Sequence, residues 1–466
     1  MMISADWSGD AGKEEVKEED DHPGRLREKL LWLYLFAFWS QFKPSEPFLV
    51  DYLIEEKGIG SEQVYQDVLD LFVYSRLPFL IIVGFFAEFD CCGYRAVLVV
   101  GALCGVVTVL MTRFGMGICS QQAAQFTVSA AFASRVAVPS MAFTLCLPSQ
   151  FQEAIHTLKA VMLFANCCAA ALGELLRDAH WFPLSFLFDL SALGQVLSLL
   201  CAACLPLPRA SPTATPTAIS NTLEEHLLSR SPRRCSQGTM TDTFQALLQD
   251  LWLSLWLRRV MWWTAWALAM NPIHGLTLTY WQSMVRSKHI LKDHNGYLSA
   301  CMYFAASLLT LGAGNAWALQ RSTSILVVAS VFLAAYLLLQ LSAADTRQLT
   351  VYGWIMLYQC LFEVVTAVAT FQVGAEVTMA TAASHSKALR SSEVRRLPRC
   401  ARLTLLFSAT TVLVAAAETG ILFVINGWKS MESRFHCLGI CLSAVGLVLS
   451  SFALVEAWSY RQMETT

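Results

Sequence analysis

Two charged side chains stand alone within long apolar segments, and they are the first candidates for chemistry. Arg135 is the only charged residue between positions 114 and 152, and Glu418 is the only one between positions 403 and 428. An ionisable group inside a bilayer is costly and usually faces the protein interior or a transport pathway. A buried guanidinium can bind an anion, whereas a buried carboxylate can accept and release a proton.

Three more carboxylates, Asp189, Glu363 and Glu376, also fall inside apolar segments. They are candidates for coupling a proton to transport, because desolvation favours the protonated form of a carboxyl group. The alternative for every buried carboxylate of this kind is a structural ion pair with a basic side chain: Arg135, Lys159 or Arg76.

A dense polar cluster, Lys43-Pro44-Ser45-Glu46-Pro47, lies near the end of the first apolar segment. Each proline lacks a backbone donor and leaves a carbonyl group without its helical partner. In lipid, a broken helix is tolerated only against protein or a water-filled cavity. The cluster therefore predicts a helix break that faces the transport pathway. The alternative is a helix end at the outer membrane surface, with Lys43 and Glu46 in water.

Composition favours a membrane protein. The chain has 466 residues, of which 55% are hydrophobic and 15% charged, and its mean hydropathy is +0.49. A soluble domain carries about 25% charged residues. The net charge of −2 excludes the basic field expected of a nucleic-acid-binding protein. No nucleotide-binding, zinc-protease or hydrolase motif is found, so we expect no enzyme activity, no cofactor and no metal site.

Apolar segments of about 20 residues are long enough to cross a membrane as helices. Twelve such segments predict an all-α polytopic membrane protein of the major-facilitator type, with two six-helix halves around a midplane site. The expected spans are 28–50, 64–87, 95–113, 118–147, 154–177, 181–205, 254–285, 295–319, 322–343, 349–382, 401–427 and 435–459.

The span pattern also predicts the domain organisation and the orientation. The regions are an acidic cytoplasmic tail (1–27), the first half (28–205), a cytoplasmic linker (206–245), the second half (246–460) and a C-terminal tail (461–466). The linker and the connection near 384–402 are both rich in arginine. Basic loops favour the cytoplasmic side, so both termini are expected there.

Aromatic residues gather in the seventh segment. Trp262, Trp263 and Trp266 are expected to form a belt at the membrane surface, where tryptophan is enriched. Further along the same segment, Tyr280 and Trp281 could stack on a flat heterocycle.

The first-span cluster belongs to a longer motif. Residues 42–53, FKPSEPFLVDYL, closely resemble the first-span signature of the reduced folate and thiamine carriers, solute carrier family 19. The family usually has Arg at the position of Lys43. The resemblance recurs in VYSRL at 73–77, in Trp262-Trp263, in Asn295-Gly296 and in VATFQV at 368–373. It covers roughly residues 28–460, the linker excepted.

The resemblance implies a twelve-span facilitator at the plasma membrane that carries a water-soluble vitamin. Arg135 fits the folate-type pattern, in which this Arg pairs with folate carboxylates, whereas thiamine-type members have Glu there. Lys159 keeps the charge of a family Arg. The tenth-span Arg and eleventh-span Lys of folate carriers fall at Gln359 and Glu418, and Val138 replaces a family Tyr. The first-span motif reads closer to the thiamine type, so the substrate stays open between folate, thiamine and another organic ion.

The leading hypothesis is a secondary transporter of folate or thiamine that works by alternating access. Its expected surroundings are the lipid bilayer, and its expected coupling ion is a proton or a counter-anion. The alternative is a non-transporting membrane receptor for a related ligand. The residues expected to line or organise the substrate site are Lys43, Glu46, Arg135, Lys159, Tyr280, Trp281, Asn295 and Glu418.

Overall fold

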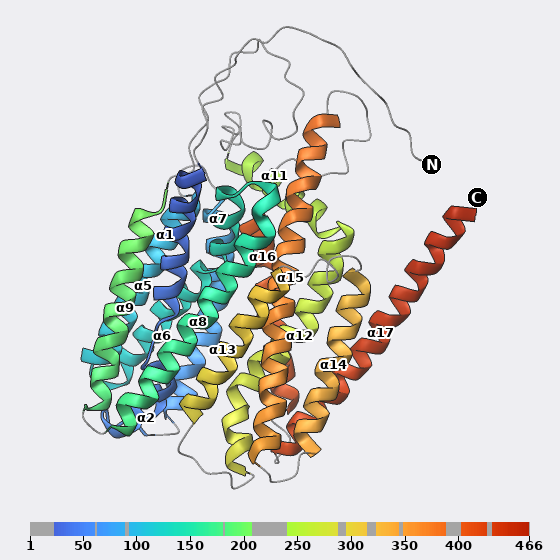
Figure 1. Cartoon of the computed structure of the whole chain (residues 1–466). Helices are drawn as coiled ribbons and strands as arrows, with labels where there is room; N and C mark the ends of the chain where they lie inside the picture. The colour runs from blue at the N-terminus through green and yellow to red at the C-terminus, as the bar shows by residue number, and fades with distance from the viewer. Residues whose placement is uncertain are drawn as a thin grey trace.

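The computed structural model describes residues 23–60, 63–88, 93–179, 182–206, 240–287, 295–314, 323–343, 348–387, 402–425 and 431–465. Most of the expected N-terminal tail and linker lies outside these ranges. The helices form one bundle, in which α1 begins and α17 ends at the same end (Figure 1). We call this end the terminal face.

The first half contains long helices and several short helical turns. Its helices are α1 (Pro23–Gln41), α2 (Leu49–Glu55), α4 (Asp70–Phe86), α5 (Gly93–Phe114), α6 (Gly117–Ser134), α7 (Ala137–Leu145), α8 (Phe151–Asp178) and α9 (Leu184–Cys204). The short turns are η1 (Glu46–Phe48), η2 (Val64–Leu69) and η3 (Pro148–Gln150).

The second half consists of longer, less interrupted helices. They are α11 (Met240–Leu255), α12 (Arg258–Ser287), α13 (Asn295–Gly314), α14 (Thr323–Ala343), α15 (Gln348–Lys387), α16 (Leu403–Ile425) and α17 (Met431–Thr465). The helix α11 begins inside the expected linker and precedes the expected seventh span, and the sequence analysis did not predict it. The helix α17 continues through most of the expected C-terminal tail.

Within the described residues, 10 helical segments are long and apolar enough to cross a membrane. The other two expected spans correspond to α1 and α12, which lie in the same bundle (Figure 1). Polar residues such as Asn271 and His274 make α12 less apolar. The all-α, multi-pass architecture is confirmed, whereas the count of twelve spans stays a prediction.

The first expected span is broken, as its two prolines predict. The helix α1 ends at Gln41, and the chain resumes as η1 and α2. The backbone N–H of Ser45 donates to Ser191 Oγ on α9 at 3.1 Å. Gly194, also on α9, lets the carbonyl of Phe42 approach closely, because a Cβ there would lie 2.8 Å from that oxygen. The break is therefore held by protein contacts rather than by lipid.

The fourth expected span is also broken, which the sequence analysis missed. The helix α6 ends at Ser134 and α7 begins at Ala137, so Arg135 sits at the junction. Pro139 lacks the N–H that would bond the carbonyl of Arg135 in a continuous helix. That carbonyl accepts a bond from Val138 N at 3.0 Å instead. Pro139 was the sequence signal for this break.

The expectation of a tryptophan belt was wrong. Trp262, Trp263 and Trp266 are buried inside the bundle. The indole N–H of Trp263 donates to Gln372 Oε1 and that of Trp266 donates to Ser330 Oγ, each at 3.0 Å. Satisfied N–H groups allow these large rings to fill the core of the second half instead of the membrane surface.

The two halves meet through a few helix pairs. The helix α8 packs along α13, and α4 packs along α16. Near the terminal face, α7 also contacts α15 and α16. Gly374 of α15 lies directly against the ring of Phe143 of α7, and a Cβ at this position would overlap that ring. This contact closes the bundle between the halves at the terminal face.

We expect Gly374→Ala to lower the free energy of unfolding by about 1–3 kcal/mol, because overpacking forces Phe143 or its helix to move. Gly353→Ala on the same helix is the matched control, since a Cβ there meets no atom within 4 Å. Thermal unfolding of the purified protein measures both variants. Equal stability of the two variants would contradict the contact.

A charged cluster joins the halves at the same face. Glu88, just after α4, accepts hydrogen bonds from the Thr404 N–H at 3.0 Å and from the Tyr94 hydroxyl at 3.3 Å. Arg402 Nη1 lies 3.7 Å from Glu88 Oε2, and its Nε lies 3.8 Å from Asp250 Oδ2 on α11. Burial raises the pKa of Glu88 to about 7, although Arg402 and the hydrogen bonds oppose this rise.

The raised pKa predicts that acid favours the closed terminal face. If opening exposes Glu88 to water, its pKa returns toward its ordinary value of 4.5. The closed form then binds the proton more tightly, so lowering the pH from about 8 to about 6 should shift the equilibrium roughly tenfold toward it. Distances between spin labels across this face measure the shift. Glu88→Gln should remove the pH dependence of this equilibrium. If the variant keeps the pH dependence of the parent protein, Glu88 is not the group responsible.

Candidate substrate site

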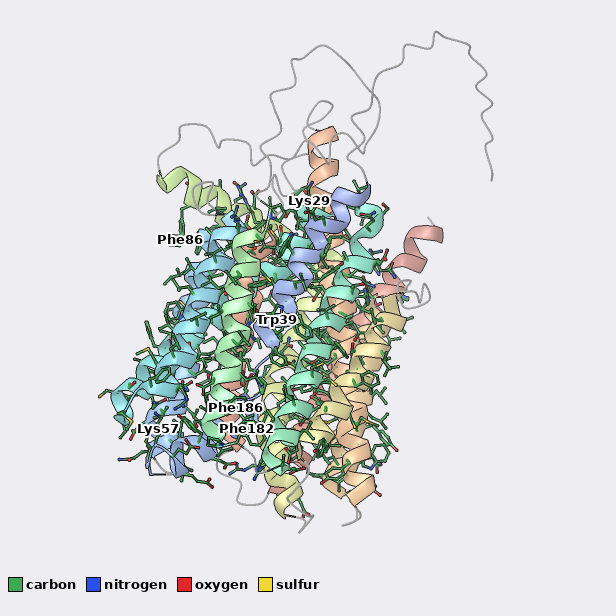
Figure 2. All side chains as sticks on the ribbon, turned by 60° about the vertical axis from the view of Figure 1, so that its left-hand side comes forward. Lys29, Trp39, Lys57, Phe86, Phe182 and Phe186 are labelled. Atoms are coloured by element: carbon green, nitrogen blue, oxygen red, sulfur yellow. The ribbon has the colours of Figure 1, made fainter. Side chains whose placement is uncertain are left out.

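The two helix breaks bring two basic side chains onto one ring. Arg135, at the junction of α6 and α7, lies over Phe132 with its guanidinium carbon 4.4 Å from the ring centre. Lys43, in the break after α1, lies over the same ring at 5.3 Å. Figure 2 shows Trp39, two residues before that break begins, about midway between the ends marked by Lys29 and Lys57. Sequence analysis missed Phe132, three residues before Arg135.

Neutral groups hold the guanidinium of Arg135. Its Nη1 donates to Gln41 Oε1 and its Nη2 donates to the carbonyl of Ser40, each at 3.1 Å. Both partners are in the last turn of α1, where a positive charge is favourable because the helix dipole is negative. Within the described part of the chain, Arg135 forms no ion pair at 4.0 Å or less. Glu46 acts on it electrostatically from farther away.

Lys43 and Glu46 form a pair at the first break. Lys43 Nζ lies 3.5 Å from Glu46 Oε2, and the two side chains differ in exposure, at 12% and 56%. The carboxylate is therefore open on one side although its cation is covered. Two expected site residues thus lie together and beside Arg135.

Lys159 and Glu363 form an ion pair across the two halves. Lys159 Nζ on α8 lies 2.5 Å from Glu363 Oε2 on α15. Gln359 Nε2 donates to the other carboxylate oxygen, Oε1, at 3.0 Å. The sequence analysis offered a structural ion pair with Lys159 as one alternative for the buried carboxylates. Glu363 forms that pair.

Aromatic side chains lie near these pairs. Tyr303 on α13 interacts electrostatically with Glu363 and with Glu46, one carboxylate from each ion pair. His274 on α12 stacks on Phe362 of α15, with ring centres 3.4 Å apart. Phe362 directly precedes Glu363 in the chain. Sequence analysis did not select Tyr303, because a single tyrosine in an apolar helix has no distinguishing pattern.

Glu418 lies on α16, facing the first half. It interacts electrostatically with Arg76 on α4, the helix that packs against α16. A Cβ at Gly275 of α12 would meet the Glu418 carboxylate, so that group also borders α12. Glu418 thus lies where helices of both halves meet.

Asp189 and Glu376 lie apart from these groups. Asp189 accepts from Arg113 Nε at 2.9 Å, and its side chain is 46% exposed. Glu376 lies 3.7 Å from Arg259 Nη1 at the start of α12, toward the terminal face. The structure therefore gives these two carboxylates local basic partners instead of joining them to Arg135.

Three expected ring contacts cannot be placed. The side chains of Tyr280, Trp281 and Asn295 lie outside the described residues, although their backbones belong to α12 and α13.

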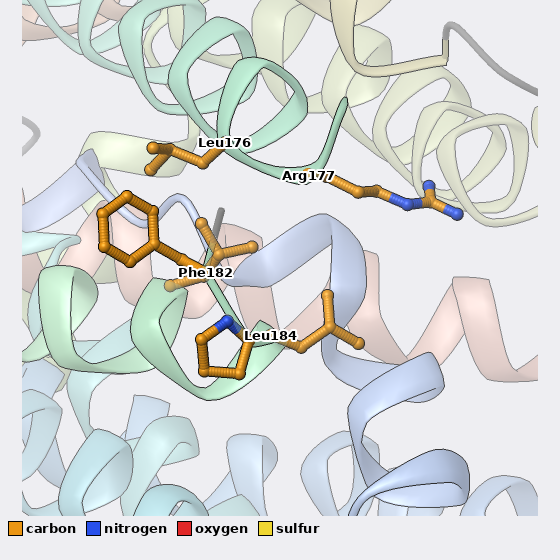
Figure 3. Close-up of a pocket in the computed structure, with 6 residues that line it drawn as sticks. Leu176, Arg177, Phe182 and Leu184 are labelled. Atoms are coloured by element: carbon orange, nitrogen blue, oxygen red, sulfur yellow. The ribbon is translucent and has the colours of Figure 1, made fainter. Parts of the chain in front are cut away.

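Two hollows lie elsewhere. One, of about 10 Å³, is lined by residues at the α8–α9 connection, among them Arg177 and Phe182 (Figure 3). The other, of about 440 Å³, lies between α14 and α17. Neither is lined by an expected site residue.

The family model described as the reduced folate carrier matches residues 25–384. The chain belongs to the reduced folate carrier family. The resemblance read from the first-span, second-span and tenth-span motifs is therefore confirmed.

Individual relatives agree with this family membership. The chain is 24% identical over 448 residues to a reduced folate transporter of Rattus norvegicus, covering 91% of this chain and 82% of the relative. It is 23% identical over 388 residues to thiamine transporter 2 of Mus musculus, covering 75% and 78%. A folate-like transporter of Dictyostelium discoideum is 23% identical over 346 residues, which is 74% of this chain but only 55% of that protein. The chain thus spans about half the length of that relative.

A solved structure shows the same fold. The proton:xylose symporter XylE of the major facilitator superfamily has a TM-score of 0.63 and 10% identity, and the match covers 92% of this chain and 96% of that one. The major-facilitator expectation is confirmed. Family and fold are those of transporters rather than enzymes, and neither comparison supports the alternative of a non-transporting receptor.

In this member of the reduced folate carrier family, most of the charges near the breaks are matched in pairs. Lys43 is paired with Glu46 and Lys159 with Glu363, while Glu418 interacts with Arg76. Arg135 is held by neutral oxygens. Of the two cations at the helix breaks, Arg135 is the one that forms no ion pair within the described part of the chain.

Proposed function

We propose that the chain is a secondary transporter of the plasma membrane that carries a water-soluble vitamin of the folate or thiamine class by alternating access. The family match and the transporters among its relatives support this proposal. We place the terminal face on the cytoplasmic side, because the arginine-rich connections of the sequence join helices there. Both termini would then be cytoplasmic.

The surroundings of Arg135 favour an anionic substrate of the folate type. A guanidinium that bonds only neutral oxygens can add a carboxylate without first losing an ion pair. Its planar donors match two carboxylate oxygens, and the guanidinium lies over the aromatic face of Phe132. This is the observation on which the choice of a carboxylate-bearing substrate rests.

The second candidate is thiamine, a cation. Glu46 favours it, because its carboxylate is 56% exposed and its partner Lys43 lies 3.5 Å away. A positively charged substrate could replace Lys43 at that carboxylate. Arg135 would then be a structural cation that stabilises the end of α1.

The pairs that cross between the halves are proposed to be the moving contacts. Lys159–Glu363 and Arg76–Glu418 join helices that must shift relative to one another if the halves rock about the site. Glu363 and Glu418 are therefore the better candidates for proton coupling. Asp189 and Glu376 are weaker candidates, since each has a basic partner away from Arg135. A counter-anion is the other coupling ion to test.

Uptake by purified protein in proteoliposomes tests the proposal. A labelled reduced folate and labelled thiamine would be offered in parallel, with and without an inward proton gradient, against protein-free vesicles. Folate uptake supports the role of Arg135, and thiamine uptake transfers the substrate role to Glu46. Stimulation by the gradient supports proton coupling, whereas stimulation by internal anion supports exchange. Saturable binding of either compound without flux would refute a transport function.

A further inference from the structure

The helix α11 has two unlike sides that neighbour each other. Leu247, Asp250 and Ser254 are buried against the bundle. Gln245 and Gln249 are exposed. Because helical residues three and four positions apart share a side, the three buried residues define the protein-facing side of α11, and the two glutamines belong to its exposed side.

The exposed side of α11 carries large apolar residues at intervals of four. The residues are Phe244, Leu248, Trp252 and Trp256, and all four are exposed. The two tryptophans are 61% and 63% exposed, and their rings meet edge to face with centres 5.7 Å apart. We call these four residues the apolar stripe of α11. Gln245 and Gln249 lie on the same exposed side, because they precede Trp252 and Trp256 by seven positions, which is about two helical turns.

The stripe continues a surface that faces lipid. The ring of Phe244 stacks on Phe85 at the end of α4, with ring centres 5.0 Å apart. Residues 67–86, which include α4, form one of the segments apolar enough to span a membrane, and Ile81, Ile82 and Phe86 are exposed on it. In Figure 2, α11 lies beside Phe86 and runs across the direction of the bundle helices at the terminal face.

We propose that α11 lies in the membrane interface at the terminal face, with its apolar stripe in contact with bilayer lipid. Tryptophan is enriched at this depth, because its ring is apolar and its N–H is polar. Lipid is the occupant that the continuity with α4 favours, because the same hydrocarbon already covers the exposed side of that helix.

The position of α11 is linked to the contact between the halves. Asp250, on its buried side, lies 3.8 Å from Arg402, which in turn reaches Glu88. Lipid that holds the stripe at the membrane interface therefore also holds Asp250 toward the charged cluster. This connects the leaflet at the terminal face with the closure of that face.

The test uses the full-length protein in nanodiscs. Trp252→Phe/Trp256→Phe removes two indoles but keeps both aromatic rings, so the difference in emission between parent and variant reports these two positions. Lipids brominated near the headgroup should quench that difference about twofold or more. Aqueous iodide should quench it much less.

Ala246→Trp in the double-phenylalanine background is the matched control, since Ala246 is exposed and lies about half a turn around the helix from Phe244. Its emission should respond to iodide more than to brominated lipid. If the emission of Trp252 and Trp256 responds to iodide alone, the stripe faces water and the proposal is wrong. If neither quencher acts, another protein surface covers the stripe, and the proposal is wrong as well.

Discussion

Arg135→Ala is expected to reduce uptake of a folate-type anion to the level of protein-free vesicles. Removing one partner of a desolvated charge pair costs about 2–5 kcal/mol, which corresponds to at least about a 30-fold loss of apparent affinity. Arg135→Lys keeps the charge but loses the planar fork, so it should fall between the parent and the alanine variant. Uptake in proteoliposomes over a range of substrate concentrations measures both.

Gln41→Leu is the matched control for Arg135. It removes a neutral hydrogen-bond acceptor of the guanidinium and leaves the charge in place. We expect a much smaller loss of uptake than for Arg135→Ala. Monodisperse, thermally stable protein must be shown for each variant, because Arg135 also bonds the carbonyl of Ser40 at the end of α1. Unchanged or increased uptake by Arg135→Ala would move the substrate role away from this residue and toward Glu46.

Breaking the Lys159–Glu363 pair is expected to destabilise the bundle strongly. Lys159→Met or Glu363→Met leaves an uncompensated charge, and the loss of one partner of a buried pair costs about 3–5 kcal/mol. The double variant removes both charges and should recover most of that stability. Thermal unfolding of the two single variants and the double variant gives the coupling energy.

The exposed pair Arg113–Asp189 is the matched control for this double-mutant cycle. Its side chains are 28% and 46% exposed, against 25% and 9% for Lys159 and Glu363. Exposed pairs are worth about 0.2–1 kcal/mol, so its coupling energy should be small. The double variant at Lys159 and Glu363 should stay impaired in uptake, because Lys159 is no longer available to the site. Additive losses at the buried pair, or full recovery of uptake, would contradict these roles.

Most of the long helices and the unusual side chains within them could be read from the amino-acid sequence alone. Segments of apolar residues must form helices in a bilayer, because every backbone N–H and C=O must find a partner within the chain. Pro44 and Pro47 predict a break for the same reason, and α1 indeed ends at Gln41. The short motifs around Lys43 and at 368–373 were enough to indicate the family.

Local sequence was less informative where a residue's role depends on its neighbours in space. Pro139 was a readable signal for the break at Arg135, but it lies four residues away and was not used. Trp262, Trp263 and Trp266 suggested a surface belt, whereas partners for their indole N–H groups on other elements allow them to be buried.

Only the tertiary structure decided which charges neutralise each other and which charge is left for a ligand. Lys159 meets Glu363, and Arg76 lies near Glu418, because α8 packs against α15 and α4 packs against α16 across the two halves. Arg135 meets neutral oxygens because two helix breaks lie side by side. Pairing falls steeply with distance, and the distance between helices is set by packing that no single segment encodes.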